Sequence, residues 1–372
     1  MTTVTGEQVM QILEGVRDPE LGGSVVELGM ITHVNVDGAD VEIGLALTIA
    51  ECPLRSQIES DTRRRVESMP GVDNVRIRTT AMTKRQRAEL MSVARRKVRE
   101  TAEPTQVSST TRVIAIASGK GGVGKSSMSV NIAAGLADRG FEVGLLDADI
   151  WGFSVPRMIG ATSRLEADAG SELIQPVEAA GVRVVSTGLI IESEETALMW
   201  RGLMLSKALE QFLKQVEWGE LDYLILDMPP GTGDVQMALT RMLPQAQMVV
   251  VTTPQRAAQR VAIRVADMAR RSHMPVVGVI ENMSGDVFGR GGGAELAEEL
   301  FVPLLASIPL DPAMVEGGDT GRPVVLRPGS GPAAAALAEA VDKVMAVVPP
   351  ADMETCTGRI AKLIADLEDG AA

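Results

Sequence analysis

The first part of the chain alternates a helical pattern with short runs of apolar and β-branched residues. Four such runs predict strands, and they lie at Val25 to Gly29, Ile31 to Val36, Val41 to Leu47 and Val72 to Ile77. Asp37 and Gly38 separate the second run from the third, and an Asp–Gly pair tolerates the positive φ angles of a tight hairpin turn. The pattern therefore predicts a small α+β domain over residues 1–78.

Longer apolar runs dominate the chain from Arg112 onward, and helical segments separate them. The predicted strands are Val113 to Ala117, Val143 to Leu146, Val182 to Ser186, Tyr223 to Leu226, Met248 to Thr252 and Val276 to Ile280. Runs without a polar face are typical of a parallel sheet that helices cover on both sides. We therefore expect a doubly wound α/β domain with a mostly parallel sheet over residues 112–350.

Two further segments flank this larger domain. Residues 79–111 carry many basic side chains in a helical pattern and end in a polar stretch, which predicts a helical spacer and a flexible linker. Residues 351–372 form a tail with a helical pattern and an apolar stripe on one face. The stripe consists of Ile360, Leu363, Ile364 and Leu367. Because acidic residues accompany it, unlike in basic interfacial helices, we expect it to pack against protein.

Length and composition narrow the class of protein. The chain has 372 residues, of which 45% are hydrophobic, so it can bury the cores of two domains. The formal net charge of −13 argues against a chain-wide attraction to nucleic acid or anionic lipid. Neither an export leader nor an apolar run of about 18 residues is evident. We therefore expect a cytoplasmic protein without nucleic-acid binding or stable membrane association.

A glycine-rich loop follows the first strand of the larger domain and opens a predicted helix. Its sequence, SGKGGVGKSS from Ser118 to Ser127, fits the P-loop pattern in the right structural context. In such loops the backbone N–H groups turn toward the phosphates, and the helix N-terminus adds a positive dipole. Lys125 should contact phosphate oxygens and Ser126 should ligate Mg²⁺. The residues expected to hold the nucleotide are Gly119, Lys120, Gly121, Gly122, Val123, Gly124, Lys125, Ser126 and Ser127.

Carboxylates end two other predicted strands of the same sheet. Asp147 and Asp149 end one run, and Asp227 ends another. Ligand sites in doubly wound sheets lie at the carboxyl ends of strands, so these side chains should converge on the glycine-rich loop. We expect Asp227 to hold Mg²⁺ together with Ser126. The alternative for Asp147 or Asp149 is that it only caps the next helix.

A second lysine, Lys120, follows the first glycine of the loop. With it, the loop resembles the deviant Walker A motif of the MinD/ParA/ArsA group of ATPases, whose signature lysine reaches the partner's nucleotide across a dimer interface. The resemblance implies a homodimer in which Lys120 and Lys125 both serve catalysis, Asp149 orients the attacking water and Asn282 contacts adenine. ATP is favoured over GTP, because no guanine-reading Asp follows Asn282. A solvated Lys120 and a turn-forming Asn282 are the plain alternatives.

Three further stretches narrow the resemblance to the Mrp/ApbC family of iron–sulfur cluster carrier ATPases. They are DADIWGFSVP from Asp147, DMPPGTGD from Asp227 and ENMS from Glu281. In the front domain, DPE from Asp18, VELGM from Val26 and CPL from Cys52 resemble the small iron–sulfur assembly domain that is often fused ahead of bacterial members. The resemblance implies an ATP-hydrolysing homodimer that assists assembly or transfer of iron–sulfur clusters to client apoproteins.

One departure from that family bears on the cluster. Members commonly carry Cys-x-x-Cys after the Asn-Met-Ser stretch, and two subunits bridge a 4Fe–4S cluster with these thiolates. Here Gly285, Asp286 and Val287 alone separate Ser284 from Phe288, so the bridging pair is absent. Iron–sulfur clusters usually need about four thiolates, and the chain has two cysteines, which are Cys52 and Cys356. Cys52 is either an iron ligand or a packed, inert thiol, and we expect Cys356 to be silent.

Two other functions stay open at this point. A MinD/ParA-like positioning or scaffold switch without its own cluster would bind a membrane or DNA when ATP closes the dimer. The tail stripe and the basic run from Lys84 to Arg99 are its possible contacts. A metabolic phosphoryl transferase rests on the shared fold alone, and Lys120 argues against it.

Overall fold

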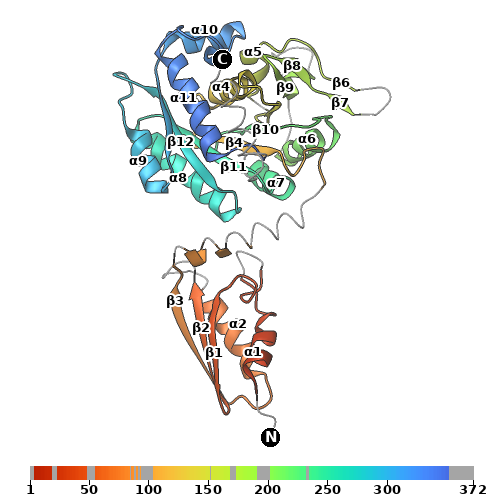
Figure 1. The fold of residues 1–372 in the computed structure, drawn as a ribbon, viewed down its shortest axis with the longest axis vertical. Helices are drawn as coiled ribbons and strands as arrows, with labels where there is room; N and C mark the ends of the chain where they lie inside the picture. Colours follow the sequence, from red (N-terminus) through yellow and green to blue (C-terminus); the bar gives the residue numbers. More distant parts are fainter. Residues whose placement is uncertain are drawn as a thin grey trace, which may run out of the picture. The chain divides into compact units, whose positions relative to one another are not determined.

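The computed structural model describes most of the 372-residue chain. The described residues are 4–18, 23–47, 55–83, 85–87, 89–90, 93, 104–150, 152–167, 173–190, 202–231 and 234–351. The chain divides into two compact units, Met1–Thr101 and Ala102–Ala372, and each has a hydrophobic core of its own (Figure 1). The predicted segment boundaries at residues 78, 111 and 350 stay predictions.

The front unit is a small α+β fold. Its elements are α1 (Gly6–Leu13), β1 (Ile31–Asp37), β2 (Asp40–Leu47), α2 (Arg55–Glu67) and β3 (Asn74–Ala81). The strand order is β1-β2-β3, with β1 antiparallel and β3 parallel to β2. Gly38 has a φ of 61° in the turn between β1 and β2, as the Asp–Gly pair predicts. The predicted α+β class of this unit is confirmed.

The prediction of a strand at Val25 to Gly29 is wrong. This segment forms successive turns, in which the Leu28 N–H donates to Ser24 O at 2.9 Å and the Met30 N–H donates to Val25 O at 2.9 Å. The Ser24 hydroxyl also accepts from the Val26 N–H at 3.2 Å. A serine that offers its side chain to nearby backbone N–H groups competes with strand pairing, and this local bonding outweighs the apolar pattern.

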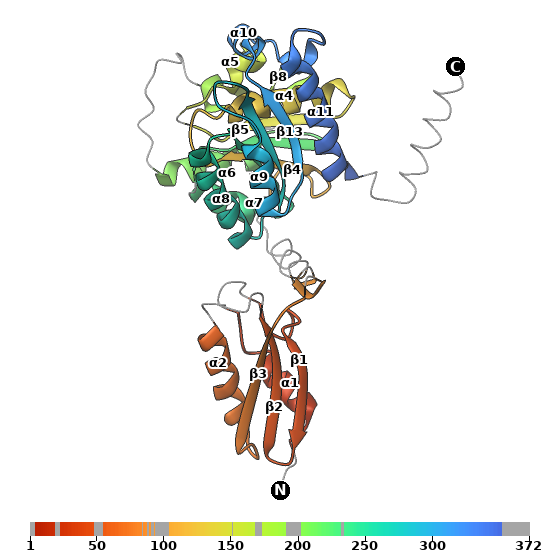
Figure 2. The same ribbon diagram turned by 90° about the vertical axis from the view of Figure 1, so that its left-hand side faces the viewer.

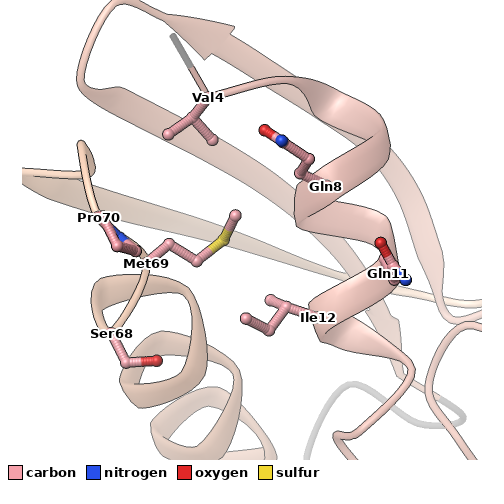
Figure 3. A pocket seen from close by; sticks show the side chains of 7 residues that line it. All are labelled: Val4, Gln8, Gln11, Ile12, Ser68, Met69 and Pro70. Atoms are coloured by element: carbon pink, nitrogen blue, oxygen red, sulfur yellow. The ribbon is translucent and has the colours of Figure 1, made fainter. Parts of the chain in front are cut away.

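A hollow of about 480 Å³ opens in the front unit between α1 and the turn after α2 (Figure 3). Ile12 and Met69 point toward each other across it, and Val4 lies at one end (Figure 3). Its lining is neutral and largely apolar, without histidine, cysteine or carboxylate. The lining residues are Val4, Gln8, Gln11, Ile12, Ser68, Met69 and Pro70.

The larger unit is built on a sheet whose eight described strands are mostly parallel. The strands are β4 (Arg112–Ser118), β5 (Val143–Asp147), β8 (Val177–Ala179), β9 (Val182–Val185), β10 (Tyr223–Asp227), β11 (Gln247–Thr252), β12 (Val276–Ser284) and β13 (Leu304–Pro309). Their order is β13-β12-β11-β4-β10-β5-β9-β8, and within it β8 alone pairs antiparallel. β6 (Glu166–Ala167) and β7 (Ile174–Gln175) form a separate short antiparallel pair. The predicted parallel sheet is confirmed.

Helices cover both faces of this sheet (Figures 1 and 2). One core contains residues of α4 (Lys125–Asp138), α5 (Val155–Ile159), α10 (Pro312–Thr320) and α11 (Pro332–Val347). The other contains residues of α6 (Gly202–Gln215), α7 (Asp234–Met242), α8 (Arg256–Arg271) and α9 (Gly292–Leu300). Ile114 and Ile116 of β4 enter the first core, whereas Val113 and Ala115 enter the second, because successive strand residues point to opposite faces. The doubly wound architecture is thus confirmed.

The hydrophobic cores contain most of the apolar residues of the predicted strands.

None of the helices in the described ranges is both long enough and apolar enough to cross a membrane. The tail stripe from Ile360 to Leu367 lies outside the described residues, so its packing stays a prediction.

Candidate nucleotide-binding site

The glycine-rich loop lies where the strand order of the sheet reverses. It follows β4, and the next strand along the chain, β5, lies to one side, whereas β11, β12 and β13 extend to the other. Asp227 at the end of β10 is in register with Ile116 of β4 and with Asp147 of β5. The carboxyl ends of three neighbouring strands therefore meet here, which is where doubly wound sheets bind ligands.

Three glycines of the loop are required by its geometry. Gly124 has a φ of 84° and precedes α4, and a Cβ there would collide with the side chain of Asn282. A Cβ on Gly119 would lie 2.5 Å from the carbonyl carbon of Val261 in α8. Gly122 has a φ of 78° and open space beside it. The loop thus packs on α8 at Gly119 and has open space beside Gly122.

Lys125 is a buried cation held between two carboxylates. Its Nζ lies 2.8 Å from Oδ1 of Asp227 and 3.9 Å from Oδ2 of Asp149. Asp227 is fully buried, and it also accepts hydrogen bonds from the hydroxyls of Ser126 and Ser129, both at 2.6 Å. The P-loop lysine, the P-loop serine and the carboxylate of β10 thus form one connected cluster, as the sequence predicts.

Asp147 is a fully buried carboxylate at the end of β5. It accepts hydrogen bonds from the Asp149 N–H at 3.1 Å, the Ser186 hydroxyl at 3.1 Å and the Val155 N–H at 3.4 Å. Burial, reinforced by the negative charge of Asp227, raises the pKa of Asp147 to about 8. Its contact with Val155 lies at the start of α5, whose N-cap residue is Ser154, so Asp147 is not the N-cap that the alternative expects.

Asp149 faces the same cluster from the loop after β5. Burial raises the pKa of its carboxyl, and the nearby Lys125 ammonium opposes that shift. Its Oδ1 accepts from the Gly152 N–H at 3.2 Å, and its Oδ2 points to Lys125. The carboxylate therefore has a defined orientation next to the P-loop.

Lys120 differs from Lys125 in its surroundings. Its side chain is exposed, and among the described residues it makes neither a hydrogen bond nor an ion pair. Its carbonyl oxygen accepts from the Ser118 hydroxyl at 3.1 Å, which fixes the backbone at this point. The side chain is therefore free to reach a group outside its own chain.

Asn282 lies within β12 and is buried, so it does not form a turn. Its Nδ2 donates to the carbonyl oxygen of Val123 in the glycine-rich loop at 2.9 Å. This hydrogen bond ties the end of β12 to the P-loop. The turn-forming alternative for Asn282 is therefore wrong.

A cavity of about 400 Å³ opens beside the P-loop and Asn282. Three methionines from different segments, Met158, Met283 and Met314, line it together with Leu310. Met283 has a φ of 56°, an unusual value for a residue with a side chain, at an irregularity of β12. Sequence reasoning did not predict this cavity. Met283 belongs to the ENMS stretch, but Met158, Met314 and Leu310 belong to no motif, and the fold alone brings them together.

Glu281 is a second residue that sequence reasoning did not single out, although it begins the ENMS stretch. It is buried and accepts from the N–H groups of Gly293 at 2.6 Å and Gly291 at 3.3 Å and from the Ser307 hydroxyl at 2.8 Å. Burial alone would raise the pKa of Glu281, but these hydrogen bonds outweigh it and hold the pKa below its ordinary value. The carboxylate thus anchors the start of α9 beside Asn282.

The segment after Ser284 forms a closed hairpin. Gly285 and Gly289 exchange two backbone hydrogen bonds of 2.8 Å, and Arg290 pairs with Asp286 at 3.2 Å. Val287 at its tip is 73% exposed. The hairpin carries no cysteine, so it has no thiolate to offer to a cluster.

The predicted iron ligand cannot be placed in this site. Cys52 and Cys356 both lie outside the described residues. Within the described ranges, no group of three or more His, Cys, Asp or Glu side chains is arranged to hold a metal ion. The cofactor residues of the P-loop, by contrast, all lie in one described segment.

The fold, the glycine-rich loop and the lysine–aspartate cluster define a P-loop NTPase. A family profile described as NUBPL iron-transfer P-loop NTPase matches residues 109–345, and one described as iron-sulfur cluster assembly protein matches residues 6–78. The chain belongs to this iron-transfer P-loop NTPase family, with the assembly-protein domain fused ahead of it. The predicted resemblance is confirmed.

Relatives across nearly the whole length agree with this assignment. The chain is 43% identical over 351 residues to the iron-sulfur cluster carrier protein of Mycobacterium leprae, covering 90% of this chain and 91% of that protein. It is 41% identical over 348 residues to the iron-sulfur cluster carrier protein of Synechocystis sp., covering 90% of this chain and 95% of that protein.

Solved structures match the larger unit. A nucleotide-binding protein in complex with ADP from Archaeoglobus fulgidus is 31% identical, with a TM-score of 0.50 over 61% of this chain and 91% of that one. The septum site-determining protein MinD complexed with Mg-ADP from Pyrococcus horikoshii is 23% identical, with a TM-score of 0.50 over 63% of this chain and 96% of that one. The second likeness shows the fold alone.

Proposed function

We propose that the protein is an ATP-binding and slowly ATP-hydrolysing homodimer that assists assembly or transfer of iron–sulfur clusters to client apoproteins. The observation that carries this proposal is the buried cluster of Lys125, Ser126 and Asp227 under a glycine-rich loop, in a chain of the iron-transfer family. Cluster chemistry with free thiols needs a reducing compartment, which supports the cytoplasm as its location.

The residues of the loop fit a nucleotide with Mg²⁺. Gly121 and Gly122 have open space beside them, so backbone N–H groups can approach phosphate oxygens there. Lys125 would turn from Asp227 to the phosphates, and Ser126 and Asp227 would hold Mg²⁺. Bound Mg²⁺ neutralises phosphate charge.

The cavity beside Asn282 suits a purine base. Its apolar methionine and leucine side chains can contact the base faces, and the Asn282 amide can meet polar edges. Two carboxylates line the cavity, and each already has a partner. Asp311 accepts from the Ala313 and Ala333 N–H groups, at 2.9 and 3.0 Å, and caps α10, whereas Asp319 pairs with Arg157 at 3.8 Å. These features support adenine as the base.

Hydrolysis in this proposal needs two chains. Lys120 is exposed and has no partner of its own in the described structure, which supports a role at the partner's nucleotide, where it neutralises charge on the transferred phosphate. Asp149 points to the same cluster as Lys125, which supports a role for its carboxylate in orienting the attacking water.

The cluster is cargo in this proposal. The closed hairpin from Gly285 to Gly289 has no thiolate, so the larger unit lacks the bridging pair of related proteins. We therefore assign the contact with cluster iron to Cys52 of the front unit and to thiols of the client or an assembly partner. The ATPase then acts as the nucleotide-dependent component of the transfer.

Anaerobic reconstitution with iron and sulfide tests this assignment, with metal analysis and the visible spectrum as readouts. With a small thiol present in place of the client's ligands, wild type should bind iron and sulfide, and Cys52→Ala should lose them while its ATP hydrolysis stays at the wild-type rate. Cys356→Ala is the matched control and should behave as wild type. Equal cluster content in Cys52→Ala and wild type would contradict the role of Cys52.

A further inference from the structure

A row of three arginines lies on the outer face of α8, the helix at the lower left of the larger unit in Figure 1. Arg256, Arg260 and Arg264 are spaced four residues apart and all are exposed, whereas Ala258, Ala262 and Val265 are buried in the core. Because a helix rises 1.5 Å per residue, the row is about 12 Å long. We call these three residues the arginine row.

The arginine row has no internal partner. None of the three guanidinium groups makes an ion pair or hydrogen bond with another residue of the described ranges. Two other arginines of α8 are engaged, since Arg271 pairs with Asp267 at 3.0 Å and Arg270 donates to Leu300 O at 2.7 Å. The row therefore presents three positive charges without an ion-pair partner in the described part of a chain whose net charge is −13.

We propose that the arginine row docks an acidic helix of a partner protein. Guanidinium groups bind carboxylates bidentately, and a helix lying along α8 presents Glu or Asp at the same four-residue spacing. Each arginine would then meet one carboxylate. Nucleic acid fits this surface less well, because α8 carries no aromatic side chain on which a base could stack.

The docked partner would lie close to the nucleotide site. The Val261 backbone, between Arg260 and Arg264, is the part of α8 against which Gly119 packs. One helix therefore separates the arginine row from the start of the P-loop. The docking itself needs no nucleotide, so its test is independent of ATP hydrolysis.

Fluorescence anisotropy with a labelled alanine-based helical peptide tests the proposal on the full chain. The peptide carries three glutamates at four-residue spacing. One control peptide carries glutamine at these three positions, and a second carries the three glutamates at adjacent positions. Wild type should bind the spaced peptide more tightly than both others, with an affinity that falls as salt rises. The triple change R256E/R260E/R264E should weaken binding by about tenfold or more.

Two matched variants separate the row from general charge. The triple Arg→Gln change at the same positions removes the positive charges without introducing negative ones, and it should also weaken peptide binding. The variant R164E/R322E/K343E reverses the charge of three exposed residues outside α8, and it should bind the spaced peptide as tightly as wild type does.

Three outcomes would overturn the proposal. They are unchanged peptide binding in both arginine-row variants, no binding by wild type at low salt, and tighter binding of a short DNA duplex than of the spaced peptide. The last result would assign the row to nucleic acid.

Discussion

At the scale of single residues, the site depends on one buried lysine among carboxylates. Lys125 contacts Asp227 directly and faces Asp149, and the two serines that hydrogen-bond Asp227 complete the group. Buried charges of this kind are stable when they are paired and hydrogen-bonded. We therefore expect a single substitution here to change both the stability of the nucleotide-free protein and its affinity for the nucleotide.

Lys125→Ala should lower ADP affinity by about 10- to 150-fold, because a charge-assisted contact to phosphate contributes about 1.5–3 kcal/mol. Isothermal titration with Mg-ADP measures this. Lys343→Ala removes an exposed lysine of α11 and should bind as wild type. Unchanged affinity in Lys125→Ala would show that the nucleotide binds elsewhere.

The titration of Asp147 should give stability a distinct pH dependence. Its pKa is raised from an ordinary value of 3.8 to about 8, so the folded state favours the protonated form. The contribution of Asp147 to the free energy of unfolding is therefore complete below the pKa that its carboxyl has in the unfolded chain. It is lost as the pH rises toward the pKa in the folded protein, by at most about 1.4 kcal/mol per pH unit. Nucleotide-free wild type should therefore lose unfolding free energy between about pH 5 and 8.

Asp147→Asn should flatten this pH dependence, as urea unfolding at several pH values would show. Asp319→Asn changes an exposed carboxylate of α10 and should keep the wild-type slope. A slope for Asp147→Asn that equals that of wild type would assign the effect to another group.

Much of the site could be predicted from the sequence, because its main parts are contiguous. The P-loop from Ser118 to Ser127 is one segment, and Asp147 and Asp227 end apolar strands. Because ligand sites of doubly wound sheets lie at the carboxyl ends of the strands, these residues could be expected to lie close together. The cavity lined by Met158, Met283 and Met314 could not be predicted, because its residues come from three separate elements. The anchoring role of Glu281 depends likewise on the N-terminus of α9, which the sequence pattern does not place.

At the scale of elements, strand periodicity predicted the sheet well but failed where side chains bond locally. The parallel strands β4, β5, β9, β10, β11 and β12 contribute buried side chains to the core, so their apolar runs are unambiguous. The segment Val25 to Gly29 is equally apolar, yet Ser24 bonds to its own neighbours and Gly29 has a φ of 64°, which favours turns.

The packing of the P-loop on α8 gives a prediction for Gly119→Ala. The new Cβ would lie 2.5 Å from the Val261 backbone, so the helix must shift, and we expect a loss of about 1–3 kcal/mol of unfolding free energy. Chemical denaturation measures it. Gly121→Ala is the matched control, because nothing lies within 4 Å of its Cβ, and its stability should change little. Equal stability of the two variants would contradict the described contact.

At the scale of the whole molecule, we propose that one hydrolysis event needs two chains. Lys120→Ala should keep nucleotide affinity within about tenfold and lose nearly all turnover, because such charge-neutralising groups contribute roughly 10³–10⁵ in rate. A mixture of Lys120→Ala and Lys125→Ala should regain activity, since each mixed dimer combines an intact P-loop with a partner's Lys120. Absence of recovery, with mixed dimers present, would contradict action across the interface.

The central claim is that ATP hydrolysis by this protein promotes cluster transfer. Its most direct test is the rate at which an apoenzyme that needs a 4Fe–4S cluster regains activity with the protein, iron and sulfide, with and without Mg-ATP. The account predicts that Mg-ATP accelerates recovery with wild type and has no effect with Lys120→Ala. Equal recovery rates for wild type with and without Mg-ATP would contradict it.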